Sequence, residues 1–322
     1  MERHQTLGLE TVFDATHPRP RVVKLKSGAC YWDVTPDNRD SELALLAVHA
    51  HPDDEASKGA ATLAKYADEG VRTSVVTCTG GERGDILNKR LDKQELAAHI
   101  AKIRAREMEE SARVLNLARH YWLGFEDSGF PAGDAKLPDG CFANVPLEVP
   151  TRRLVEILRK ERPQVVITYD ELGGYPHPDH IRTHEVTMRA LSAAADPKYE
   201  PDLGPPHTTT KVYYHASFGK ERLEKLHLAL VSLGVESPLD QILASRRGVP
   251  EKPITTKIPI VPWLPQRRKA LLAHRSQVDP DSFFLKIPDE LLAEVLPTDD
   301  YYLVTSTVET DIPEVDLFAG IR

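Results

Sequence analysis

Residues 43–59 read LALLAVHAHPDDEASKG and join an apolar run to a polar, histidine-rich loop. The run 43–48 has the length and composition of a strand that is buried on both faces. Clustered His and Asp side chains follow directly, and a helix is expected over 58–69. Open α/β sheets bind ligands where their parallel strands end. The pattern therefore predicts a site at the carboxyl end of this strand.

A second segment, far downstream, repeats this arrangement. Residues 165–168 read VVIT and predict another buried strand, which GGYPHPDH at 173–180 and a helix over 181–195 follow. Both loops contain His-Pro-Asp. Because parallel strands end at one edge of a sheet, we expect the two loops to lie together.

The alternation of strands and helices predicts the fold class. It indicates an α/β protein with a Rossmann-like, mostly parallel sheet and helices on both faces. Before the second loop we expect strands at 73–77 and 121–123 and helices at 93–115 and 151–161. After residue 195 we expect strands at 212–214 and 301–306, an edge strand within 258–263, and helices at 219–233, 266–274 and 288–296.

The chain is expected to form a single catalytic domain, residues 41–322, that C-terminal elements complete; two domains are the alternative. Residues 1–40 are polar and carry several prolines, so they predict an N-terminal extension that packs on the domain or stays mobile. Tyr31 and Trp32 favour packing.

Composition restricts the function classes. The 322 residues carry a net charge of −8, which argues against a nucleic-acid partner or a membrane surface, since both favour a basic face. The three cysteines form no CxxC pair, and no apolar run reaches 18 residues. We therefore expect a cytoplasmic protein; its oligomeric state does not follow from these features.

The two His/Asp loops indicate a metal site. Imidazole and carboxylate ligands suit Zn²⁺ or Fe²⁺. His51, one carboxylate of the Asp53–Asp54 pair and His180 would supply three ligands and leave one position open for water. The remaining carboxylate would take the proton of that water, and His177 would donate to the oxyanion. Hydrolysis of an amide or ester follows. A simple helix N-cap is the alternative for the Asp pair.

The segments HPDDE at 51–55 and GYPHPDH at 174–180 resemble the zinc-dependent N-deacetylase family of LmbE-like and PIG-L-like enzymes. The closer resemblance is to the amidase branch that acts on mycothiol S-conjugates. It rests on residues 49–70, 75–88 and 173–186 and extends more loosely from about residue 43 to the C-terminus. The first 40 residues do not match the family.

This resemblance implies roles for individual residues. His51, Asp54 and His180 would be the zinc ligands, and Asp53 the general base. His177 would stabilise the tetrahedral intermediate or act as general acid, oriented by Asp179. The remaining implied roles are carbonyl polarisation by Tyr175, binding of the sugar–inositol part by Arg104, Asp127 and Asp85, recognition of the cysteinyl side by Lys58, and a C-terminal motif with His274 and Gln277.

The expected function is a zinc amidase, with Fe²⁺ possible in the cell, that cleaves a small-molecule thiol conjugate. It would release an N-acetylcysteine S-conjugate and glucosaminyl-inositol in thiol-dependent detoxification. The nearest alternative is a deacetylase of N-acetylglucosaminyl-inositol or another sugar, against which Lys58 and GGERGD at 80–85 weigh. Further alternatives are a biosynthetic thiol-conjugate amidase, a 2-His-1-carboxylate iron oxygenase and a catalytically silent carbohydrate-binding protein.

Overall fold

A computed structural model describes residues 22–35, 41–131, 135–217, 219–245 and 252–322. These residues form one nine-stranded sheet in the order β1-β2-β5-β4-β3-β6-β7-β9-β8. The strands are β1 (Val22–Lys24), β2 (Cys30–Asp33), β3 (Ala44–His49), β4 (Arg72–Thr79), β5 (Arg119–Phe125), β6 (Val165–Thr168), β7 (Lys211–His215), β8 (Thr256–Pro259) and β9 (Thr298–Ser306).

The centre of the sheet is parallel and its two edges are antiparallel. β5, β4, β3, β6 and β7 run side by side in one direction. Leu45 of β3 pairs with Thr73 on one side and with Val165 on the other. β9 and β8 extend one edge, whereas β2 and β1 extend the other. The predicted Rossmann-like, mostly parallel sheet is confirmed.

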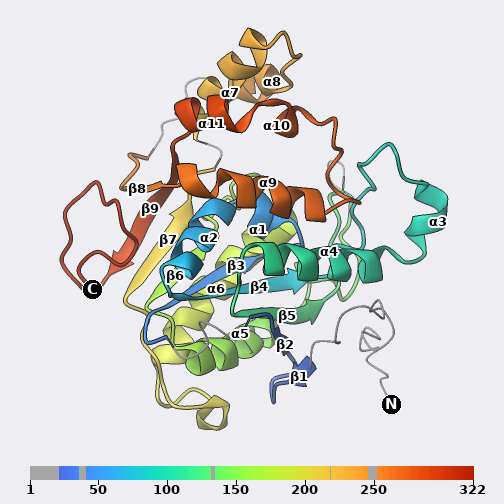
Figure 1. Ribbon diagram of the computed structural model, residues 1–322. Helices are drawn as coiled ribbons and strands as arrows, with labels where there is room; N and C mark the ends of the chain where they lie inside the picture. Colours follow the sequence, from blue (N-terminus) through green and yellow to red (C-terminus); the bar gives the residue numbers. More distant parts are fainter. Residues whose placement is uncertain (1–21, 36–40, 132–134, 218, 246–251) are drawn as a thin grey trace.

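Helices cover both faces of the sheet, as predicted (Figure 1). They are α1 (Asp54–Ser57), α2 (Ala60–Asp68), α3 (Lys93–Ala97), α4 (Ile100–Val114), α5 (Glu148–Glu161), α6 (Pro178–Ala195), α7 (Lys220–Ser232), α8 (Leu239–Ser245), α9 (Leu264–Ala273), α10 (Phe283–Lys286), α11 (Asp289–Val295) and the 3-10 turns η2 (Pro201–Leu203) and η3 (Val261–Trp263). Side chains of β3 alternate between the two core layers, because successive residues of a strand point to opposite faces. Leu45 packs with α2, α4 and α9, whereas Leu46 packs with α5 and α6.

Two predicted helices are interrupted in the structure. The segment expected as one helix over 93–115 forms α3 and α4, because α3 buries none of its side chains and only α4 follows the core, from Ile100 onward. The helix expected over 58–69 is preceded by α1 and starts at Ala60. Between them Gly59 has φ +86°, and a Cβ there would lie 2.9 Å from the Tyr301 hydroxyl. This close approach requires glycine.

Part of the predicted N-terminal extension belongs to the sheet. Cys30 pairs with Trp122 and Trp32 with His120, so β2 continues the sheet beyond β5. Trp32 is buried, which confirms the packing expected of this segment. Residues 1–21 and 36–40 lie outside the described residues. The domain boundary at residue 40 stays a prediction. In the described chain, no helix is long and apolar enough to cross a membrane.

Candidate metal centre

Three predicted ligands converge at the carboxyl ends of β3 and β6. His51 follows β3, Asp54 opens α1, and His180 lies in the first turn of α6. His51 Nδ1 and His180 Nε2 lie 3.6 and 3.4 Å from the same oxygen, Asp54 Oδ2. All three side chains are buried, and one ligand atom from each lies within 4.8 Å of the others. This arrangement can hold a divalent ion with an open coordination position.

Hydrogen bonds on the far side of each ligand fix its orientation. His180 Nδ1 donates to the Gly173 carbonyl at 3.0 Å, so Nε2 keeps its lone pair toward Asp54. His51 Nε2 donates to Asp179 Oδ2 at 3.2 Å, which leaves Nδ1 free in the same way. Lys58 Nζ donates to Asp54 Oδ1 at 2.5 Å. Such outer partners are typical of metal-binding histidines and carboxylates.

The electrostatics of the site favour a bound cation. Burial lowers the pKa of His51, but hydrogen bonds to Asp127, Asp179 and Asp54 outweigh burial and raise it well above its usual value. Burial lowers the pKa of His180 well below its usual value, so this ring is neutral at pH 7. The carboxylates around His51 make this part of the site favourable for positive charge, and the neutral His180 ring has a nitrogen lone pair to offer. Both properties suit a divalent metal ion.

Asp53 lies beside the ligands in an unusual backbone conformation. Its φ of 100° lies in the region that glycine favours, which costs about 1–3 kcal/mol for other residues. Its side chain makes no capping hydrogen bond within the described structure, so the N-cap interpretation is wrong for this residue. Burial raises the pKa of the Asp53 carboxyl although Arg104 opposes it. A raised pKa suits a general base.

His177 and Tyr175 border the same space. His177 caps α6 by accepting the Asp179 N–H at its Nδ1, 3.1 Å away, which leaves Nε2 as a donor. Its ring centroid lies 4.7 Å from that of His51. The Tyr175 hydroxyl lies 3.4 Å from His180 Nε2. Phe130, which the sequence did not indicate, stacks on His177 at 5.2 Å with its side chain largely exposed.

The contacts of Asp179 differ from those expected. Its carboxylate was expected to orient His177, but it accepts from His51 and, at 2.9 Å, from the Ser128 N–H. His177 contacts the backbone of Asp179 instead. The reason is helical geometry, since residues two apart at a helix start do not face each other. Asp179 therefore orients the first predicted ligand, His51.

The four predicted substrate contacts occupy different environments. Arg104 is buried, and its guanidinium donates to the carbonyls of Gly81 and Pro52 and pairs with Asp53 at 3.2 Å. Arg104 therefore forms a structural salt bridge with Asp53. Asp127 Oδ1 lies 3.6 Å from His51 Nε2 and accepts the Gly129 N–H. Lys58 lies against Asp54, and Asp85 is exposed in its loop. Their roles toward a substrate stay predictions.

A buried network behind Asp53 received no role from the sequence. Glu55 accepts from Ser111 Oγ and from His274 Nε2, each at 2.6 Å, and its other oxygen accepts the Asp53 N–H at 3.0 Å. Glu55 ends the motif HPDDE at 51–55, and His274 begins the C-terminal motif HRSQ at 274–277. Only the fold brings these two residues together. Ser276 of the same motif also contacts α4, since its N–H and its hydroxyl both donate to the Glu107 carboxylate.

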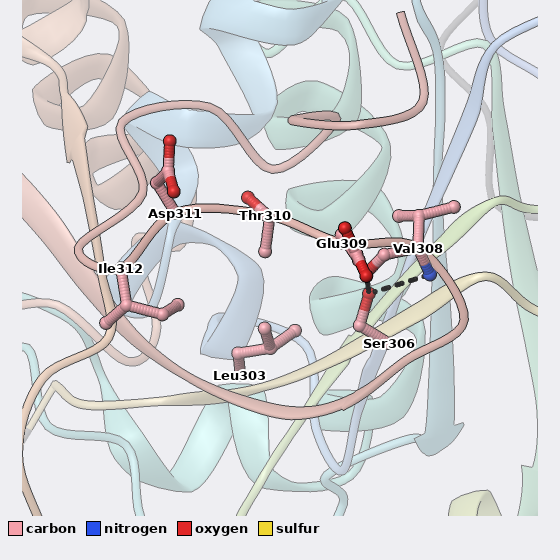
Figure 2. A pocket seen from close by; sticks show the side chains of 7 residues that line it. All are labelled: Leu303, Ser306, Val308, Glu309, Thr310, Asp311 and Ile312. Atoms are coloured by element: carbon pink, nitrogen blue, oxygen red, sulfur yellow. Dashed lines mark hydrogen bonds between the residues drawn. The ribbon is translucent and has the colours of Figure 1, made fainter.

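The surface hollow in Figure 2 lies away from this centre. It is lined by Leu303, Ser306, Val308, Glu309, Thr310, Asp311 and Ile312. Ser306 pairs with Lys211 at the amino end of β7, whereas the candidate ligands follow the carboxyl ends of β3 and β6. The hollow is therefore separate from the site.

Comparison with known proteins agrees with this geometry. Residues 46–191 match the family model "PIG-L: GlcNAc-PI de-N-acetylase". A mycothiol S-conjugate amidase of Streptomyces coelicolor is 49% identical over 288 residues, which cover 87% of this chain and 98% of that protein. A 1D-myo-inositol 2-acetamido-2-deoxy-alpha-D-glucopyranoside deacetylase of Geodermatophilus obscurus is 38% identical over 298 residues, covering 89% and 99%.

The fold likewise matches a solved structure. The N,N'-diacetylchitobiose deacetylase of Pyrococcus horikoshii superposes with a TM-score of 0.56 at 23% identity, over 84% of this chain and 87% of that one. At this identity the match supports the fold alone. The near full-length sequence relatives and the matching family model show that the chain belongs to the PIG-L family of amide-hydrolysing enzymes.

Proposed function

We propose that this protein is a zinc-dependent amidase that cleaves mycothiol S-conjugates in the cytoplasm. The products would be an N-acetylcysteine S-conjugate and glucosaminyl-inositol, and the reaction would serve thiol-dependent detoxification. The observation that carries the proposal is the 49% identity to an amidase named for this substrate, across nearly the whole length of both chains.

Zinc fits the donor set of the site. His51, Asp54 and His180 would hold it, because their free ring nitrogens and one carboxylate oxygen face a common point. Zinc supplies Lewis acidity, which polarises a carbonyl and makes water a stronger nucleophile. Asp179 and Lys58 would keep His51 and Asp54 in place for binding.

The remaining side chains would perform the proton transfers. Asp53 takes the proton of the attacking water, for which the raised pKa of its partly buried carboxyl is suited. His177 donates from Nε2 to the oxyanion that forms on the amide carbonyl, with the Tyr175 hydroxyl beside it. Asp53 or His177 then protonates the leaving amine.

Lys58 supports the amidase assignment. Its ammonium donates to Asp54 and, at 3.1 Å, to Ser57 Oγ. An ammonium has three hydrogens, so one remains for the cysteinyl part of a substrate. Asp127, beside His51, and the exposed Asp85 would bind the sugar–inositol hydroxyls, with Arg104 holding the loops that frame them.

A sugar N-deacetylase is the second candidate. The 38% identity to the inositol-sugar deacetylase favours it, because that relative also spans nearly the whole chain. Both reactions are amide hydrolysis and would use the same ligands and base. They differ in the acyl group, which is a substituted cysteine in one case and acetate in the other.

A product-release assay separates the two candidates. Purified, zinc-loaded protein is given a mycothiol–bimane conjugate and N-acetylglucosaminyl-inositol in parallel, with Asp53→Ala as the control. We expect faster cleavage of the conjugate and loss of that activity in the variant. A preference for the acetyl sugar would establish the deacetylase, and hydrolysis of neither by the wild type would reject both.

A further inference from the structure

The backbone of Asp53 differs from that of Asn116 and Arg162, two other non-glycine residues with positive φ. Asn116 and Arg162, at 53° and 50°, lie in the ordinary left-handed well. Asp53, with φ 100° and ψ −20°, lies outside it. A side chain persists in such a conformation only where its surroundings hold it. The contacts around Asp53 therefore show what holds it.

Both ends of the peptide unit between Pro52 and Asp53 are held. Its carbonyl oxygen accepts from the Arg104 guanidinium, and its N–H donates to Glu55 Oε2 at 3.0 Å. The orientation of this peptide plane restricts the φ of Asp53, because φ is the rotation about the N–Cα bond that joins the plane to the rest of Asp53. Arg104 also pairs with the Asp53 carboxylate at 3.2 Å. Backbone and side chain of the proposed base are thus held together.

Glu55 is in turn held by two other elements. Ser111 of α4 and His274, the C-cap of α9, both donate to its Oε1. Glu55 and His274 are both fully buried. Figure 1 shows α9 lying across α1, α2 and α4, so this contact joins the C-terminal part of the chain to the loop after β3. His274 stands 219 residues from Glu55 in sequence.

We infer that Glu55 and His274 are positioning residues for Asp53. His274 holds the Glu55 carboxylate, and that carboxylate holds the Asp53 N–H, so that the base keeps the conformation that aims it at the attacking water. The inference rests on the proposed role of Asp53 as base. It assigns to the end of α9 a part in the reaction, through two residues whose side-chain hydrogen bonds, among the described residues, go to Asp53, Ser111 and each other and to none of the predicted metal ligands.

Three variants test the inference. His274→Ala removes the donor to Glu55, whereas His274→Gln retains an amide donor. Leu264→Ala is the matched control, because Leu264 is a buried residue at the other end of α9. Each variant is measured for kcat, KM, zinc content and melting temperature, and its crystal structure gives the φ of Asp53.

We expect His274→Ala to lower kcat about 10- to 100-fold, because small misplacements of a reacting group have effects of this size. KM and zinc content should stay within about two-fold, and the φ of Asp53 should leave the region near 100°. His274→Gln should recover most of the lost kcat. Leu264→Ala should lower the melting temperature with little change in kcat.

Three outcomes would overturn the inference: an unchanged Asp53 φ in His274→Ala, equal kcat losses for Ala and Gln, or a loss in Leu264→Ala as large as that in His274→Ala. Should His274→Ala fail to fold, Glu55→Gln replaces it, since an amide cannot accept at both ends, and the same kcat loss is expected. Each variant is assayed with both the mycothiol–bimane conjugate and N-acetylglucosaminyl-inositol. If the wild type prefers the acetyl sugar, the amidase assignment is wrong, but the kcat comparison between variants can still be made with that substrate. The measurement of φ needs no substrate.

Discussion

Two buried clusters of charged side chains lie at opposite ends of the central strands. One is the candidate metal centre at the carboxyl ends of β3 and β6. The other, which we call the Lys211 cluster, consists of Lys211, Tyr213, Thr256 and Glu314, and Lys211 stands at the amino end of β7. Both are excluded from solvent, but they differ in how their hydrogen-bonding groups are used.

In the Lys211 cluster the charged groups are paired with one another. Lys211 Nζ donates to Glu314 and to the Ala319 carbonyl, and Glu314 Oε2 accepts from the hydroxyls of Tyr213 and Thr256 at 2.7 and 2.8 Å. In the metal centre two ring nitrogens, of His51 and His180, lie 3.6 and 3.4 Å from one oxygen of Asp54, distances longer than those of ordinary hydrogen bonds. Full mutual pairing stabilises a fold, whereas converging acceptors need a cation. The difference separates a structural cluster from a functional one.

The largest effect is expected for Asp53→Asn. Loss of the base should lower kcat about 10²- to 10⁴-fold. Stability in urea should fall only slightly, because Asn tolerates positive φ and Arg104, which loses its Asp53 partner, keeps the carbonyls of Gly81 and Pro52. Zinc content by mass spectrometry is the control for an intact ligand set. Unaltered turnover in a zinc-replete variant would remove Asp53 from the mechanism.

Glu314→Gln should have the opposite profile. It leaves the Lys211 ammonium buried without its counter-charge, so the free energy of unfolding should fall by about 3–5 kcal/mol. The kcat of the folded fraction should stay at the wild-type value. The double variant Lys211→Met with Glu314→Leu should lose less stability, since it leaves no unpaired charge. A loss of kcat with stability preserved would contradict the distinction between the clusters.

Asp179→Asn tests the hydrogen bond behind His51. The change weakens the acceptor for His51 Nε2, so zinc affinity should fall about 10- to 100-fold in competition with a chelator. Asp85→Asn, in an exposed loop, is the matched control and should bind zinc as the wild type does. Equal affinities of the two variants would show that Asp179 does not support the ligand.

The smallest effect is a pH dependence of the Glu55–His274 pair. Burial disfavours both charges, but His274 lowers the pKa of Glu55 to about 2, and Glu55 raises the pKa of His274. The stabilisation from Glu55 is present above its unfolded pKa of 4.5 and is lost as pH falls toward 2. That from His274 is present below 6.5 and is lost as pH rises through its raised value.

The stability difference between metal-free wild type and His274→Gln should therefore be largest between pH 4.5 and pH 6.5, where both stabilising charges are present. We expect this difference to be larger near pH 5.5 than at pH 9, because His274 loses its charge as pH rises through its raised pKa. Urea unfolding of both proteins at the two pH values measures it. A difference that does not vary with pH would show that the pair is uncharged in the folded protein.

The sequence by itself determined the two strands that lead into the site and the two ligand-bearing loops. The apolar runs at 43–48 and 165–168 form β3 and β6, and each is followed directly by its His-Pro-Asp loop. Parallel neighbours end at one edge, so the convergence of His51, His180 and one of the two aspartates followed from local patterns, whereas the choice of Asp54 followed from the family resemblance. These features are readable because each depends on residues close together in the chain.

Only the tertiary structure decided which side chains support those loops. It directs Asp179 to His51 instead of His177, and it places Arg104 between the loops at Gly81 and Pro52. It also brings His274 to Glu55, and β2 to β5. Each of these contacts joins residues far apart in sequence. The contact of Asp179 depends in addition on the direction of its side chain in the first turn of α6. Periodicity and motif spacing describe neighbours along the chain and do not contain this information.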